Sequence, residues 1–80
     1  MKPGFHAASL AGSKPLQRVL QFLRMFGKTG ITTAILAEYA NVQNVATWVS
    51  ALRHNGFDIE CKYEGQSNDG ARIYRYWLRG

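Results

Sequence analysis

The chain has 80 residues, so it holds one domain at most and is too short for a barrel enzyme or a dinucleotide-binding unit with a substrate domain. Its hydrophobic fraction of 46% excludes a disordered tail and is enough for a small core. Ten Lys and Arg against five Asp and Glu give a net charge of +5, which favours a polyanionic partner such as nucleic acid or an anionic membrane surface.

The first helix is predicted over residues 14–26, after an N-terminal arm of residues 1–13 that lacks a sustained period. Ser13 is a suitable N-cap, and Pro15 suits the first turn, where its missing N–H costs nothing. Apolar residues then recur at three- and four-residue steps, which predicts one buried helical face. We therefore place the folded domain at residues 14–80.

Two further helices are predicted between residues 32 and 54. Thr32 is placed to cap a helix of about two turns, which ends at Asn41, a residue type that tolerates the left-handed conformation of a tight turn. The next helix spans residues 43–54, begins at Gln43 or Asn44 and ends before Gly56. Its inward stripe is Val42, Val45, Val49 and Leu52.

After Gly56 the hydrophobic period changes from about 3.6 to 2, which predicts a β-hairpin. The two strands cover residues 57–64 and 71–78, and residues 65–70 form a polar turn. In the second strand we prefer the face of Tyr74, Tyr76 and Leu78 as the buried one, because the opposite face carries Arg75. Acidic residues on the first strand are expected to pair with arginines on the second.

The predicted order is helix, short extended piece, helix, tight turn, helix and hairpin. This is a mainly α fold with a small hairpin (α+β), the arrangement of a three-helix winged helix-turn-helix domain. The second and third helices would form the helix-turn-helix pair, and the hairpin would be the wing.

Four segments also resemble a family of small winged helix-turn-helix proteins that is common in bacteriophages and prophages. They are Ile31-Thr32-Thr33, the Ala40-Asn41-Val42 turn, Val49-Ser50-Ala51-Leu52-Arg53-His54-Asn55-Gly56-Phe57-Asp58-Ile59-Glu60, and Tyr76-Trp77-Leu78. In that family an Ile-Thr pair opens the second helix, a Leu-Arg-x-x-Gly-aromatic-x-Ile block joins the third helix to the wing, and aromatic-x-Leu ends the wing. The similarity covers roughly residues 15–79 and implies double-stranded DNA as the partner. Trp48 departs from it, since similar sequences often have Arg there.

The residue types on these elements suit DNA binding by a small regulator or accessory protein, found in the cytoplasm and on the nucleoid. Asn, Gln, Thr and Ser on the third helix can bond base edges in the major groove, and the start of the second helix can hold a phosphate through backbone N–H groups. Basic residues of the hairpin can grip the DNA backbone. The candidate DNA-binding residues are Thr32, Thr33, Gln43, Asn44, Thr47, Ser50, Arg53, Lys62, Arg72 and Arg75.

An alternative function is a winged-helix module that binds a host or phage protein. The third-helix face carries almost no charge before Arg53, and two tryptophans, Trp48 and Trp77, are candidate anchors at a protein interface. For Trp48 we favour the other interpretation, an edge-of-core residue that covers the first helix or the wing. A single module this small buries little DNA surface, so specific binding calls for a homodimer or for cooperative neighbours.

The sequence predicts neither an enzyme nor a cofactor or metal site. His6, His54 and Cys61 show no metal-ligand spacing. Cys61, the one cysteine, permits no internal disulfide, which favours a reducing compartment, and its alternation with Phe57 predicts a small core residue. No apolar run approaches the roughly 20 residues of a membrane span, and no signal peptide is evident.

Overall fold

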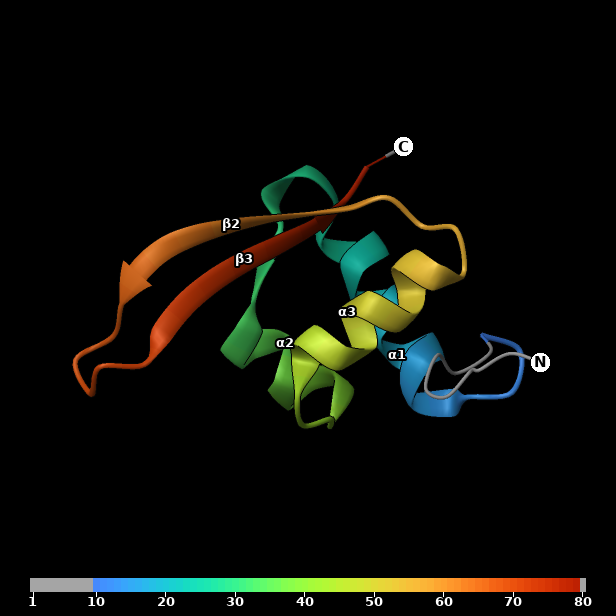
Figure 1. Cartoon of the computed structure of the whole chain (residues 1–80), viewed down its shortest axis with the longest axis horizontal. Coiled ribbons are helices and arrows are strands. Elements are labelled where there is room, and N and C mark those ends of the chain that lie inside the picture. Colours follow the sequence, from blue (N-terminus) through green and yellow to red (C-terminus); the bar gives the residue numbers. More distant parts are fainter. Residues whose placement is uncertain (1–9, 80) are drawn as a thin grey trace.

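Three α-helices and a three-stranded antiparallel sheet make up residues 10–79, the part of the chain that the computed structural model describes. In chain order the elements are α1 (Lys14–Phe26), a 3-10 turn (Gly27–Thr29), β1 (Ile31–Thr32), α2 (Thr33–Ala40), α3 (Val45–His54), β2 (Ile59–Gln66) and β3 (Arg72–Leu78). Figure 1 shows the helices gathered on one side, with the β2–β3 hairpin reaching past them. Among the described residues, no helix is both long and apolar enough to cross a bilayer.

Helix α1 has the predicted bounds and the predicted cap. The Ser13 Oγ accepts a hydrogen bond from the Leu16 backbone N–H at 3.2 Å, which satisfies one of the donors that a helix start leaves open. Leu16, Val19, Leu20 and Leu23 are buried, so the predicted apolar face is the one that meets the core.

Residues 10–12, which fall in the predicted arm, form a turn against the helices. The Leu10 N–H donates to Asn55 Oδ1 at 3.2 Å, and the Gln17 side-chain amide donates to the carbonyls of Leu10 and Ala11. Leu10 is half-buried and packs on the core. The rest of the arm, residues 1–9 with Phe5 and His6, lies outside the described residues.

Helices α2 and α3 are joined by a turn with two left-handed asparagines. Asn41 has a φ of 55° and Asn44 a φ of 54°, and the asparagine side chain tolerates this conformation better than most. The end of α2 at Asn41 confirms the prediction. Asn44, one of the two predicted starting residues, is the N-cap of α3, whose first helical residue is Val45. Val45, Val49 and Leu52 are buried as expected, and Val42 is half-buried.

Thr32 occupies the N-cap of α2, but its side chain makes no capping hydrogen bond. Thr32 also belongs to β1, where it pairs with Arg75 of β3. The hydroxyl of the next threonine contacts the sheet, since Thr33 Oγ1 donates to the Tyr74 carbonyl at 3.3 Å. The helix start is thereby tied to the sheet.

The sheet has the order β1-β3-β2, so the hairpin gains a third strand from the segment before α2. Ile31 pairs with Tyr76, and Ile59 pairs with Leu78 at the other side of β3. A bulge interrupts β2 between Tyr63 and Gly65. Tyr76 is only 6% exposed and faces the helices, which confirms the preferred face of the second strand.

The prediction that Cys61 is a core residue was wrong, because its side chain is exposed. Ile59 is buried on the same face of β2, but the helices pack mainly on β3, the central strand. Farther along the hairpin no helix covers the β2 side, and Tyr63 is 50% exposed. Alternation therefore identified the helix-facing side of the strand correctly but not how far the helices extend along it.

Candidate functional site

The outward face of α3 and of the turn before it carries four uncharged polar side chains. Gln43, Asn44, Thr47 and Ser50 are all exposed, while the opposite face of the helix is buried. They come from eight consecutive residues, so α3 brings them together as the sequence predicts. Each presents hydrogen-bonding atoms of the kind that contact base edges.

Trp48 lies at the edge of the core and supports this face. Its side chain is half-buried and packs against the core cluster. Its Nε1–H donates to the Gln43 carbonyl at 2.9 Å, which fixes the backbone of the turn that leads into α3. Trp48 therefore acts as a positioning residue for Gln43.

Arg53 ties α3 to the start of β2. Its Nε and Nη2 donate to the Ile59 carbonyl at 3.2 and 2.6 Å. The residue as a whole remains exposed, in the last turn of α3. Two nitrogens of its guanidinium are thus used inside the fold.

The three basic candidates of the hairpin are divided between its two faces. Arg72 shares the helix-facing side with Tyr74, two residues on, whereas Lys62 and Arg75 are directly opposed on the outer side. Lys62 and Arg72 are exposed, and neither makes a side-chain hydrogen bond or ion pair with another described residue. Of the three cations, these two are the ones available to a ligand.

Arg75 is held by contacts within the protein. Its Nε donates to Glu64 Oε2 at 2.7 Å, and its Nη1 donates to the carbonyls of Thr29 and Gly30 at 3.2 and 3.3 Å. The guanidinium hydrogen bond lowers the pKa of Glu64 below its ordinary value, and the same bond raises the pKa of Arg75. The structure thus gives Arg75 a bracing role between the hairpin and the turn after α1.

The outer face of the hairpin carries nearly balanced charges. Glu60 pairs with Arg79 at 3.4 Å in addition to the Glu64–Arg75 pair, which confirms the predicted cross-strand pairing for these two acids. Such exposed pairs contribute little to stability, typically below about 1 kcal/mol. They also change the charge of this surface, because each acid offsets the positive charge of its arginine partner.

The threonines at the start of α2 are used structurally. Thr33 Oγ1 is bonded to the Tyr74 carbonyl, and Thr32 is half-buried in β1. The Thr33 hydroxyl is therefore engaged within the fold. Trp77, the second tryptophan candidate, is half-buried on the outer face of β3.

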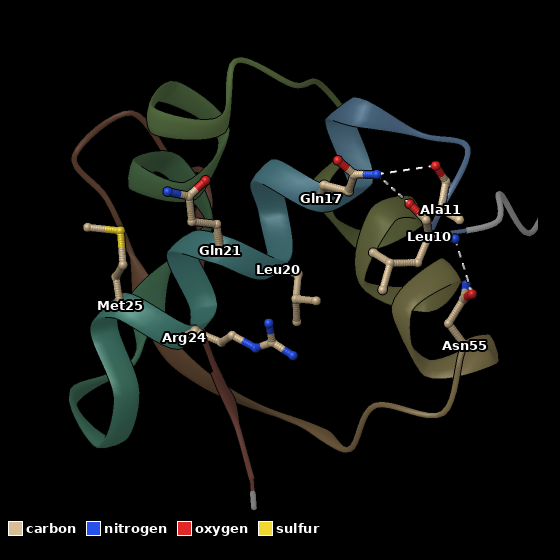
Figure 2. A pocket seen from close by; sticks show the side chains of 8 residues that line it. All are labelled: Leu10, Ala11, Gln17, Leu20, Gln21, Arg24, Met25 and Asn55. Carbon is tan, nitrogen blue, oxygen red and sulfur yellow. Dashed lines mark hydrogen bonds between the residues drawn. The ribbon is translucent and has the colours of Figure 1, made fainter.

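Two hollows were not predicted from the sequence. One lies on the helix-facing side of the hairpin and is lined by Tyr63, Gln66, Arg72 and Tyr74. The other is an open groove of about 760 Å³ beside α1 (Figure 2). Its lining residues are Leu10, Ala11, Gln17, Leu20, Gln21, Arg24, Met25 and Asn55. The groove beside α1 depends on contacts between Leu10, α1 and Asn55, which lie far apart in the chain and leave no local sequence signal. The residues of the hairpin hollow all lie within the predicted hairpin.

Comparisons of the chain with protein-family models, with curated proteins and with solved structures find no match.

Proposed function

We propose that the chain is a winged helix-turn-helix protein of the phage and prophage type, and that it binds double-stranded DNA. In this proposal α2 and α3 are the helix-turn-helix pair, α3 enters the major groove, and the β2–β3 hairpin is the wing along the backbone. The order of the elements and the projecting hairpin support the layout (Figure 1). The role would be that of a transcriptional regulator or an accessory DNA-binding factor.

One observation carries the proposal: the exposed side of α3 is polar while its other side is buried. Gln43, Asn44, Thr47 and Ser50 are exposed together, and Val45, Val49 and Leu52 are 3%, 1% and 0% exposed. A helix held this firmly can present its polar side chains to base edges at a low entropic cost. The net charge of +5 supplies the long-range attraction to phosphates.

The test is fluorescence anisotropy with duplex DNA over a salt series, followed by selection of a preferred site from random duplexes. We expect binding that weakens steeply with salt, because phosphate contacts release counterions. Asn44→Ala should reduce the preference for the selected site by about 1–3 kcal/mol and change binding to random DNA much less. The absence of any binding at low salt would overturn the proposal.

A matched pair of arginine variants distinguishes a direct contact with a DNA phosphate from the effect of the protein's net charge. Arg72→Gln removes an unpaired cation of the hairpin, and Arg79→Gln removes a cation that is paired with Glu60. Both lower the net charge by one. We expect Arg72→Gln to reduce the salt slope by about 1, as the loss of one phosphate contact would, and Arg79→Gln to leave it nearly unchanged.

A second candidate function is binding of a protein partner, and exposed apolar side chains on α1 and α2 favour it. Met25, Ile35 and Tyr39 are 66%, 39% and 54% exposed. Tyr39 also makes edge contacts with Phe22 and Phe26, at centroid distances of 5.6 and 6.1 Å. Photo-crosslinking from position 39 in the presence of DNA would show whether this surface is covered by protein. A DNA-bound chain with no crosslinked protein would count against this candidate.

A further inference from the structure

The hollow on the helix-facing side of the hairpin combines aromatic rings with an available cation. Tyr63, Gln66, Arg72 and Tyr74 line it, and its volume is about 320 Å³. Tyr63 and Tyr74 are directly opposed on neighbouring strands, and Gln66 is opposed to Arg72 beyond the bulge. Figure 1 shows the far end of the hairpin extending past α2, and Tyr63, Gln66 and Arg72 are exposed.

The two tyrosine rings contact each other across the strands. Their ring centroids lie 5.4 Å apart with an angle of 57° between the ring planes. Tyr74 also packs against the core and its carbonyl accepts the hydrogen bond from Thr33, whereas Tyr63 is 50% exposed. Tyr74 is therefore packed on the fold, and the half-exposed Tyr63 ring lies against it.

Arg72 is the one charged residue among those that line the hollow. Arg72 makes no side-chain hydrogen bond or ion pair with the rest of the described chain. The acids of the hairpin are used elsewhere, since Glu60 and Glu64 pair with arginines on the outer face. Asp69 in the turn accepts hydrogen bonds from the Ser67 hydroxyl and the Ala71 N–H. The hollow thus suits a planar, apolar group attached to an anion.

We infer that this hollow binds an unpaired nucleotide, with the base stacked on Tyr63 and its phosphate held by Arg72. Inside an intact duplex both faces of a base are covered by its neighbours, so an aromatic side chain can stack only on a terminal, extruded or single-stranded base. The inference rests on the proposed function, which places the hairpin along DNA. It adds a preference for duplexes that continue into a single strand.

The experiment compares a blunt duplex with the same duplex carrying a short single-stranded extension. We expect the extension to tighten binding by about five- to hundredfold, the usual contribution of one stacked base. Tyr63→Leu, which keeps an apolar cross-strand contact, should abolish this gain, and Tyr63→Phe should retain it. Thermal melting followed by circular dichroism checks that each variant is folded.

A 2-aminopurine base in the extension reports stacking directly. Its fluorescence should fall when the wild type or Tyr63→Phe binds, and it should not fall with Tyr63→Leu. Arg72→Gln should weaken binding to the extended duplex more than Arg79→Gln does. Loss of the gain in both Tyr63 variants would overturn the stacking role.

The two proposals fail in different ways. Equal binding of blunt and extended duplexes, without quenching, overturns the nucleotide site and leaves the duplex-binding function in place. Binding of neither DNA overturns the proposed function together with this inference. Binding of the extended DNA alone, lost in Tyr63→Leu, supports the nucleotide site and overturns the duplex function.

Discussion

Gly30 is the position where an added methyl group should do the most damage. It has a φ of 78° and a ψ of 170°, a backbone conformation that is essentially restricted to glycine. A Cβ built there would lie 2.9 Å from the Arg75 Cγ and 3.1 Å from the Tyr76 carbonyl oxygen. The close approach exists because the segment before β1 runs directly against β3.

The loss in the free energy of unfolding caused by Gly30→Ala can be worked out from the structure. The conformation alone costs roughly 1–3 kcal/mol for a residue with a side chain. The Tyr76 carbonyl belongs to the central strand, so it cannot retreat without disturbing the pairing with Ile31. We expect a total loss of about 3–4 kcal/mol in the free energy of unfolding, which in a domain this size lowers the Tm by roughly 12–32 °C.

Gly56→Ala is the matched control, because Gly56 has a φ of 96° with nothing within 4 Å of an added Cβ. It should cost only the conformational part, about 1–2 kcal/mol. Urea denaturation followed by tryptophan fluorescence measures both variants. If the two losses agree within about 0.5 kcal/mol, the close approach of Gly30 to β3 contributes nothing and the reasoning is refuted.

Two further predictions concern the helix cap and the hairpin ion pair. Ser13→Ala should reduce the free energy of unfolding by about 1 kcal/mol, measured in urea, and Ser13→Gly by less; equal losses would contradict the capping role. The pKa of Glu64 is lowered from 4.5 in the folded chain, so its ionised form stabilises the fold above that pH, and the contribution disappears as the pH falls through the folded-state pKa. Glu64→Gln should therefore have a lower Tm than the wild type at neutral pH and the same Tm in strong acid. Glu38→Gln removes no ion pair, so the difference between its Tm and that of the wild type should not change in this way with pH.

Local sequence signals predicted the helices well. The cap at Ser13, the apolar spacing of α1 and the left-handed Asn41 each act within a few residues, and each lies where it was predicted. The polar side of α3 follows from the same periodicity, so the exposure of Asn44 and Thr47 was foreseeable. Whether these residues contact DNA remains a prediction.

Long-range contacts are what the sequence did not reveal. The short extended segment before α2 was predicted, but its pairing with β3 joins residues more than forty positions apart. A similar sequence separation lies between Arg75 and the Thr29 and Gly30 carbonyls that it contacts. Arg75 was predicted to contact DNA because of its charge, but its guanidinium makes hydrogen bonds within the fold. The exposed side chain of Cys61 has a related cause. The alternation of apolar and polar residues predicts which side of a strand faces the helices, but it does not predict how far along the strand the helices extend.

The bulge in β2 has a consequence for how the protein behaves at high concentration. In the described chain β2 pairs with β3 on one side only, so its other side is the kind of open strand edge that invites association between copies. The bulge breaks the regular spacing of backbone groups near Tyr63, and charged Glu60, Lys62 and Glu64 recur along the strand. Both devices oppose edge-to-edge aggregation. The charge of Lys62 thus opposes association between copies of the chain, whether or not Lys62 also contacts a ligand.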